Sequence, residues 1–227
     1  MYKYVIFDAD NTLLDFTLAE KYSLTEALKQ FSYKGDLDKI LYSYREINRK
    51  IWLELEKGKI SNEELKEERF KRLFKKFNLD YNIHKFSEVY LENLSESGYL
   101  INGAKEICKY LKEKKYKVVV LTNGIKKIQE SRIEKSSIKQ FIDLMIVSQE
   151  VGVNKPDPYI FEYTLKKFGS IDKNDAIMIG DSLTADIKGG INYGIDTCWF
   201  NLNKVENNTD IISKYEIKCL DELKNIL

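Results

Sequence analysis

Near the N-terminus the sequence reads Tyr4-Val5-Ile6-Phe7-Asp8-Ala9-Asp10-Asn11-Thr12. The apolar part of this stretch is short, β-branched and aromatic, which predicts a buried strand rather than a helix. Asp8 and Asp10 then follow the carboxyl end of the expected strand, which is where open α/β sheets bind their ligands. Two carboxylates in that place indicate a metal-assisted nucleophile with an acid/base partner. The same residues would also suit an Asx turn that closes a strand.

From residue 103 onward the sequence alternates between helical and extended patterns. We expect helices at 103–115, 125–135, 157–168 and 183–193, and strands at 117–122, 144–147, 176–179 and 197–200. Strands that alternate with helices of this length form a parallel sheet with right-handed crossovers. The predicted fold class is therefore α/β, with a doubly wound, Rossmann-like sheet.

Residues 16–97 interrupt this pattern with almost no strand signal. Their apolar residues recur near helical spacing, and Ser61-Asn62-Glu63-Glu64 resembles a capping box that opens a helix. We expect an all-helical domain at 16–97, inserted into a core domain made of 1–15 and 98–227, with hinges at the two junctions.

Composition excludes several classes of protein. The 37 Lys and Arg residues nearly balance the 36 Asp and Glu residues, so no net field attracts a nucleic acid polymer or an anionic membrane. The apolar stretches are too short to span a bilayer, the chain enters a strand directly, and the three cysteines form no Cys-x-x-Cys pair. We expect a cytoplasmic protein, as a monomer or small homo-oligomer. The single histidine, His84, is interpreted as a surface residue.

Three later segments carry polar residues at the ends of expected strands or the starts of helices. Thr122-Asn123-Gly124 offers a hydroxyl and backbone N–H groups that could bind phosphate, although it also suits an ordinary turn and helix cap. Lys155 lies in a loop that contains both prolines of the chain. Gly180-Asp181-Ser182 ends another strand, and Asp186 follows at the start of a helix.

A charge count indicates that these parts need a cation. Asp8, Asp181 and Asp186 with a phosphate dianion would carry a charge of about −5, and repulsion reaches roughly 4 kcal/mol per charge pair at about 4 Å. One Mg²⁺ and Lys155 would return about +3. Magnesium is favoured over zinc because the candidate ligands are all oxygens.

Taken together, the four segments resemble the four motifs of the haloacid dehalogenase (HAD) superfamily, in the right order. They are Asp8-Ala9-Asp10-Asn11-Thr12, Thr122, Lys155 and the segment from Gly180 to Asp186. The helical insertion resembles the C1 cap of subfamily I. The resemblance implies a core that carries the chemistry and a cap that varies with the substrate.

The resemblance also implies a role for each motif residue. Asp8 would be the nucleophile that forms an aspartyl-phosphate. Asp10 would protonate the leaving alcohol, then deprotonate the hydrolytic water, and lend its backbone carbonyl to Mg²⁺. Thr122 and Lys155 would hold the phosphoryl oxygens, with Asn123 and Gly124 beside them as substrate-binding residues, and Asp181 would ligate the metal. Asp186 would either ligate through water or orient Lys155.

Within the superfamily, the residues look most like the pyrimidine 5′-nucleotidase branch, whose members release phosphate from nucleoside monophosphates such as UMP and dTMP. The matching strings are Asp8 to Phe16, Gly58 to Leu65 and Arg69-Phe70. A nucleobase needs an aromatic face and hydrogen-bonding groups, so Tyr44, Asn48, Trp52 and Arg69 are candidate substrate contacts. Tyr44 and Trp52 would equally suit the apolar core of the cap itself.

Other functions stay open. A phosphatase for a different small phosphate monoester, such as a sugar phosphate or phosphoglycolate, would use the same core. A haloacid dehalogenase is disfavoured. The resemblance implies an acid/base role for Asp10, and the dehalogenases of the superfamily carry no acid/base aspartate at that position. A non-catalytic phosphate-binding module is disfavoured by the intact set of Asp8, Asp10, Lys155 and Asp181.

Overall fold

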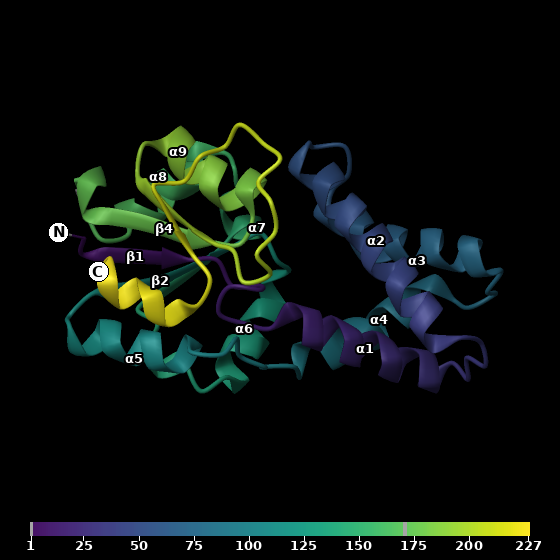
Figure 1. Cartoon of the computed structure of the whole chain (residues 1–227). Helices are drawn as coiled ribbons and strands as arrows, with labels where there is room; N and C mark the ends of the chain where they lie inside the picture. Colours follow the sequence, from purple (N-terminus) through teal and green to yellow (C-terminus); the bar gives the residue numbers. More distant parts are fainter. Residues whose placement is uncertain (1, 170–171) are drawn as a thin grey trace. The chain divides into compact units, whose positions relative to one another are not determined.

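The structure is a computed structural model that describes residues 2–169 and 172–227, and the chain divides into two compact units (Figure 1). One unit, the core, contains the residues up to Phe16 and from Gly98 onward; the other, the helical unit, is Thr17–Ser97. The boundaries between the two units fall at 16/17 and 97/98, and the predicted boundaries are 15/16 and 97/98. Compactness alone does not show independent folding, so the division into core and cap domains remains a proposal.

The described residues of the core form a six-stranded parallel sheet, in the order β3-β2-β1-β4-β5-β6. Its strands are β1 (Tyr4–Phe7), β2 (Lys117–Thr122), β3 (Leu144–Val147), β4 (Ala176–Gly180), β5 (Asp196–Phe200) and β6 (Tyr215–Ile217). The first strand lies at the centre, and the chain adds β2 and β3 on one side before it adds the others on the opposite side. This is the doubly wound α/β fold that the sequence predicts.

Both faces of the sheet are apolar and covered. Val5 and Phe7 of β1 pack into one hydrophobic cluster, while Ile6 between them packs into another, because successive strand residues point to opposite faces. Residues of α5 (Ala104–Glu113) and the short helix η4 (Leu220–Asn225) join the first cluster, and α8 (Pro158–Lys166) joins the second (Figure 1). Strands buried on both faces explain the near-continuous apolar runs of the sequence.

The remaining helical elements of the core lie between the strands. They are α6 (Lys126–Lys135), η1 (Lys139–Phe141), α7 (Ser148–Val151), η2 (Lys173–Asp175), η3 (Leu183–Ile187) and α9 (Lys188–Tyr193). The helix expected at 183–193 is a π-helical turn, η3, followed by α9, and the Ile187 N–H reaches back to the Ser182 carbonyl at 3.2 Å. Within the described residues, no helix has both the length and the apolar character that a membrane crossing requires.

The helical unit is built from four helices. They are α1 (Phe16–Gln30), whose first residue belongs to the core, α2 (Leu37–Glu56), α3 (Asn62–Phe77) and α4 (Ile83–Ser95). The predicted capping box at the start of α3 is confirmed: the Ser61 hydroxyl accepts from the Glu64 N–H, and the Glu64 carboxylate accepts from the Ser61 N–H. An aromatic cluster that includes Tyr44, Phe70 and Tyr90 fills the interior.

Candidate active site

The sheet topology brings the carboxyl ends of β2, β1 and β4 side by side. Phe7, the last residue of β1, pairs with Val120 of β2 and with Ile179 of β4, and the Asp8 N–H donates to the Ile179 carbonyl at 2.9 Å. Side chains just beyond these three strands therefore share one edge of the sheet. This is the switch point at which open α/β sheets bind ligands.

The chain reverses tightly after β1. The N–H groups of Leu13 and Leu14 both donate to the Ala9 carbonyl, at 3.0 and 2.8 Å, and Asn11 has a left-handed φ of 57°. Asparagine adopts this conformation more readily than most residues, which suits it to the turn. The turn gives the two aspartates different partners. The Asp8 carboxylate binds Lys155 at the carboxyl end of the sheet, whereas the Asp10 carboxylate binds Gln129 of α6.

Lys155 is buried, and its ammonium group binds three oxygens. Nζ lies 2.5 Å from Asp8 Oδ1, 2.7 Å from Asp186 Oδ1 and 2.7 Å from the Leu121 carbonyl, and only 1% of the residue is exposed. An ammonium group has three donors, so each is used here. The two carboxylates raise the pKa of Lys155 against the opposing effect of its own burial, which is the largest single influence. Lys155 is therefore a fixed cation at physiological pH.

Asn123 fixes the main chain that carries this lysine. Its side-chain amide donates to the Lys155 carbonyl at 2.9 Å and accepts from the Lys155 N–H at 2.8 Å. These two bonds connect the end of β2 to the loop before α8. The substrate contact expected of Asn123 stays a prediction, whereas its bonds to the Lys155 backbone are direct.

Asp186 is equally buried and is bonded through both carboxylate oxygens. Oδ1 accepts from Lys155, and Oδ2 accepts from the Ser182 N–H at 3.0 Å. The π-helical turn η3 carries this residue, and the absence of a side chain on Gly180 leaves the space that the carboxylate occupies. Of the two roles left open for Asp186, orienting Lys155 is therefore the one with a contact in the structure.

We predict that Gly180→Ala lowers the kcat/KM of a reaction catalysed at this site by about 100-fold. Displacing a positioned group by about 1 Å can have an effect of that size. The added methyl group would overlap the Asp186 carboxylate, which holds Lys155 in place. The control is Gly190→Ala, whose methyl group would crowd Thr197 and Met178 instead. That variant should lose thermal stability but keep the kcat/KM of the folded enzyme. Wild-type kcat/KM in Gly180→Ala would contradict the prediction.

Three carboxylates form a cluster at this edge. Among the described residues, oxygens of Asp8, Asp181 and Asp186 lie within 4.8 Å of one another. Burial raises the pKa of Asp8 to about 7, with added repulsion from Asp186 and Asp10 and an opposing pull from Lys155. Burial and the two neighbouring carboxylates likewise raise the pKa of Asp181. One lysine does not balance the three acids, and hard oxygen donors at this spacing fit a divalent cation such as Mg²⁺.

Thr122 is oriented as a donor. Its Oγ1 accepts from the Gly124 N–H at 3.1 Å and from Gln129 Nε2 at 3.0 Å, so both acceptor positions of the hydroxyl are used. The hydroxyl proton is left to donate to an oxygen of a bound group. The phosphate contact expected of Thr122 stays a prediction.

Sequence reasoning missed two residues beside this site, Gln129 and Arg132 on α6. Both are buried and both bind the Asp10 carboxylate. Their burial follows a helical stripe shared with Ile128 and Ile133. Polar residues on the apolar stripe of a helix near a candidate site are the signal that could have revealed them.

The candidate cap residues lie in the interior of the helical unit. Asn48 and Arg69 are almost fully buried: Asn48 Nδ2 donates to Glu20 Oε1 at 2.8 Å, and the Arg69 guanidinium lies over the rings of Phe70 and Tyr90. Trp52 is half-buried against the Ile51-Leu55-Leu65 cluster. Their proposed contact with substrate stays a prediction.

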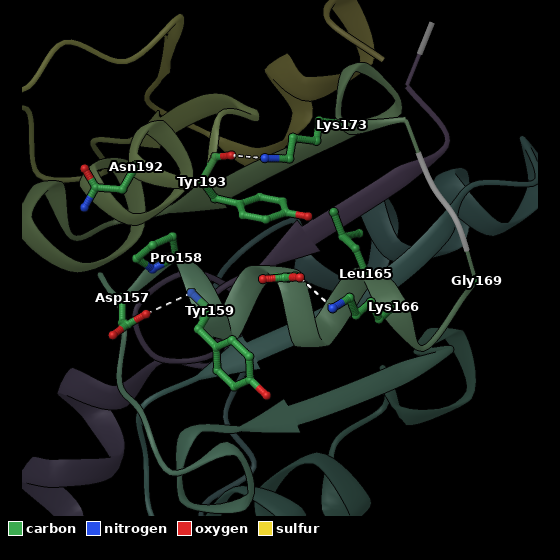
Figure 2. A pocket seen from close by; sticks show the side chains of 10 residues that line it. Asp157, Pro158, Tyr159, Leu165, Lys166, Gly169, Lys173, Asn192 and Tyr193 are labelled. Carbon is green, nitrogen blue, oxygen red and sulfur yellow. Dashed lines mark hydrogen bonds and ion pairs between the residues drawn. The ribbon is translucent and has the colours of Figure 1, made fainter.

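The core also has a surface hollow of about 540 Å³ beside α8 and α9 (Figure 2). Its charged side chains already have partners: Lys166 pairs with Glu162 at 2.5 Å, and Lys173 donates to the Tyr193 carbonyl at 2.7 Å. Within the described residues, its lining includes none of the clustered carboxylates. The candidate active site is therefore the sheet edge and not this hollow.

Comparison with known proteins identifies the family of the chain. The family model of haloacid dehalogenase-like hydrolases matches residues 5–200. Pyrimidine 5′-nucleotidase PynA of Streptococcus pneumoniae is 37% identical and covers 100% of this chain and 97% of its own, and YjjG of Escherichia coli, also named a pyrimidine 5′-nucleotidase, is 29% identical over 99% and 97%. The magnesium-bound crystal structure of the HAD-hydrolase YfnB of Bacillus subtilis has 33% identity and a TM-score of 0.93 over 100% and 98% of the two chains. The chain belongs to the haloacid dehalogenase-like hydrolase family.

Proposed function

We propose that this chain is a Mg²⁺-dependent phosphomonoesterase that forms an aspartyl-phosphate on Asp8 and acts on pyrimidine nucleoside monophosphates. The observation that supports it most directly is the Lys155 ammonium group between Asp8 and Asp186, with Asp181 in the same acidic cluster. A nucleophile, a fixed cation and a set of hard oxygen ligands at one sheet edge suit phosphoryl transfer.

In this proposal the Asp8 carboxylate attacks phosphorus while Thr122 donates to an oxygen of the transferring group. Lys155, whose three N–H donors bind Asp8, Asp186 and the Leu121 carbonyl in the structure, would turn the donor now on Asp8 toward another of these oxygens. Asp10 gives its proton to the leaving alkoxide and later takes a proton from the water that hydrolyses the aspartyl-phosphate. Thr122 contributes its hydroxyl proton, and the Gly124 N–H, which donates to the Thr122 hydroxyl oxygen, helps to orient that proton. Gly124 itself remains a proposed substrate-binding residue. Lys155 stays charged through both steps.

Asp8 and Asp181, with the main-chain carbonyl of Asp10, are the groups that we propose for the metal site. Asp186, whose two oxygens accept from Lys155 and Ser182, would reach the metal through water. When bound, Mg²⁺ would offset the charge of the carboxylates and of the phosphate, which lowers the repulsion that the nucleophile meets. The presence of Asp10 favours this chemistry over cleavage of a carbon–halogen bond. A phosphate-binding module without catalysis would not need an acid/base group there.

The choice of a pyrimidine nucleotide rests on the relatives named as pyrimidine 5′-nucleotidases. On the cap, Asn48, Trp52 and Arg69 remain our candidates for contact with the base. The competing substrates are other small phosphate monoesters, such as a sugar phosphate or phosphoglycolate. We take the partner of this enzyme to be a small molecule in either case.

The test is a panel of phosphate esters assayed after EDTA treatment and again after Mg²⁺ is returned. The panel contains uridine and thymidine monophosphates, a purine monophosphate, a hexose phosphate and phosphoglycolate. We expect no turnover in EDTA, recovery with Mg²⁺ and the highest kcat/KM for the pyrimidine nucleotides. Turnover without metal would overturn the mechanism, and a preference for a sugar phosphate would overturn the substrate class.

We also predict that Mg²⁺ binding weakens as the pH falls. Because the pKa of Asp8 is raised to about 7, its carboxylate is mostly protonated at about pH 6 and mostly charged at about pH 8. A metal needs the charged form, so the dissociation constant for Mg²⁺ should be about tenfold higher at the lower pH. Calorimetric titrations at the two pH values, in buffers of different ionisation enthalpy, measure both the affinity and the proton released.

The same shift sets the pH dependence of stability in EDTA. A carboxyl group whose pKa is higher in the folded than in the unfolded state stabilises the fold below about pH 4 and loses that contribution as the pH rises to about 7. The rise in Tm on adding Mg²⁺ should therefore be larger at about pH 8 than at about pH 6. An equal rise at both values would mean that Asp8 titrates near its ordinary pKa.

A further inference from the structure

Two polar side chains of α6, Gln129 and Arg132, are buried beside Asp10. Gln129 is 1% exposed and Arg132 is 0% exposed, although both types of residue are normally found at the surface. Burial of such groups is costly unless hydrogen bonds replace the lost water. The bonds that they make should therefore reveal why they are there.

Together the two side chains bind both oxygens of the Asp10 carboxylate. Arg132 Nη1 forms an ion pair with Asp10 Oδ1, and Gln129 Nε2 donates to Asp10 Oδ2 at 2.9 Å. Gln129 Oε1 in turn accepts from Arg132 Nη1 at 3.0 Å, so each side chain also orients the other. This closed set of bonds fixes the plane of the carboxylate as well as its position.

The pair itself is held by its surroundings. The Arg132 guanidinium lies 5.7 Å from the centre of the Phe16 ring, and a Cβ atom on Gly98 would lie only 3.0 Å from the Arg132 carbonyl oxygen. At Gly124 a Cβ atom would lie 2.7 Å from Gln129, so only glycine leaves room for that side chain. Gln129 also connects the carboxylate to the Thr122 hydroxyl. Asp10 is thus aligned with the phosphate-binding end of β2.

We propose that Gln129 and Arg132 are positioning residues that hold Asp10 for proton transfer to the leaving group, an inference that rests on the proposed phosphatase function. As the bond between phosphorus and the leaving oxygen breaks, its electron pair stays on that oxygen. The oxygen takes the proton from Asp10, while Asp8 forms the new bond to phosphorus. Asp10 must therefore enter this step as the neutral acid, with its proton on Oδ2, and it leaves the step as the carboxylate that the Arg132 guanidinium binds in the structure.

This role has a signature that a purely structural role lacks. The alkoxide that leaves from a nucleotide is a strong base and needs the proton, whereas 4-nitrophenolate is stable enough to leave without it. Loss of alignment at Asp10 should therefore slow uridine 5′-monophosphate far more than 4-nitrophenyl phosphate. The parameter to compare is kcat/KM, because it reports the steps up to the departure of the leaving group.

The experiment measures kcat/KM for both esters, with Mg²⁺ present, in wild type, Arg132→Met, Gln129→Met and Asp10→Asn. General acid catalysis contributes about 10²–10⁴-fold, so we expect Arg132→Met to lose about 100-fold on the nucleotide and less than about threefold on the aryl ester. In the Asp10→Asn background, Arg132→Met should change neither kcat/KM value by more than about twofold. Without the Asp10 carboxyl group, Gln129 and Arg132 have no general acid to position.

The control is Arg72→Met, which removes another carboxylate-binding arginine, one that pairs with Glu54 and Glu68 and lies in the helical unit. Its ratio of the two kcat/KM values should equal that of wild type. Equal losses on both esters in Arg132→Met, or a further loss in the Asp10→Asn background, would overturn the proposal. If Arg132→Met does not fold, the same ratio in Gln129→Met decides. A wild-type protein that hydrolyses neither ester would instead overturn the proposed function.

Discussion

Asp8→Asn is expected to lower kcat/KM for uridine 5′-monophosphate by at least about 10⁴-fold, the scale seen when a nucleophile is removed. Amide nitrogen or oxygen cannot form the phosphoryl bond that a carboxylate forms. The fold should survive, because an amide is close in size to the carboxylate and can still accept a hydrogen bond from Lys155. Steady-state kinetics with Mg²⁺, alongside a thermal melt, measures both effects.

A matched control is Asp143→Asn. Like Asp8, Asp143 has a largely buried side chain that pairs with a lysine, Lys112 at 2.7 Å. It directly precedes β3, so it lies at the amino ends of the strands, away from the candidate site at their carboxyl ends. We expect wild-type kcat/KM from this variant. Beryllofluoride, which mimics an acyl-phosphate, should raise the Tm of wild type and of Asp143→Asn but not of Asp8→Asn. More than about one per cent residual activity in Asp8→Asn would rule out Asp8 as the nucleophile.

The sheet could be predicted because it is buried on both faces. The runs at 117–122 and 144–147 coincide with β2 and β3, and both consist mostly of apolar side chains, as a parallel sheet covered by helices requires. The strand β6 was missed. It has only three residues, and its central Glu216 is exposed, so neither alternation nor an apolar run marks it. The family resemblance is confirmed by the family model and the relatives.

The acidic and lysine residues of the site could be predicted because each follows a strand or precedes a helix, and topology alone brings such positions together. Gln129 and Arg132 could not be found in this way. They lie 119 and 122 residues from Asp10 in the chain, and their burial depends on how α6 packs on the turn after β1. The helix at 125–135 was predicted correctly, but polar residues on a helix are usually solvated.

The cap shows a similar limit. Tyr44 suited either a nucleobase contact or the apolar core of the cap, and the structure buries it fully, with its ring stacked 5.6 Å from Phe70. Burial raises the pKa of the Tyr44 and Tyr90 hydroxyls, so both remain neutral. A sequence records that an aromatic residue is present, but helix packing decides which side of the helix faces the interior.

Lys155→Met is expected to lower the free energy of unfolding by about 3–5 kcal/mol in EDTA, the usual effect of removing one partner of a buried ion pair. Asp8 and Asp186 would then face each other without the cation that lies 2.5 and 2.7 Å from them. Since Lys155 opposes the rise in the pKa of Asp8, that pKa should climb further in the variant. At about pH 5 Asp8 is protonated in the folded state with or without Lys155, so the lysine has little charge to stabilise there. At about pH 8 Asp8 is charged in the folded wild type and depends on Lys155. The loss of stability should therefore be larger at about pH 8 than at about pH 5.

Urea unfolding at the two pH values measures the effect, and Lys112→Met is the control. Lys112 also binds one carboxylate through two short contacts, at 2.7 and 2.8 Å to Asp143, but its side chain is 33% exposed, so its loss should be below about 1 kcal/mol. Adding Asp186→Asn to Lys155→Met removes one of the two facing charges and should restore part of the stability. A Lys155→Met variant no less stable than Lys112→Met, or one unaffected by the second substitution, would mean that Lys155 is not the cation on which this cluster depends.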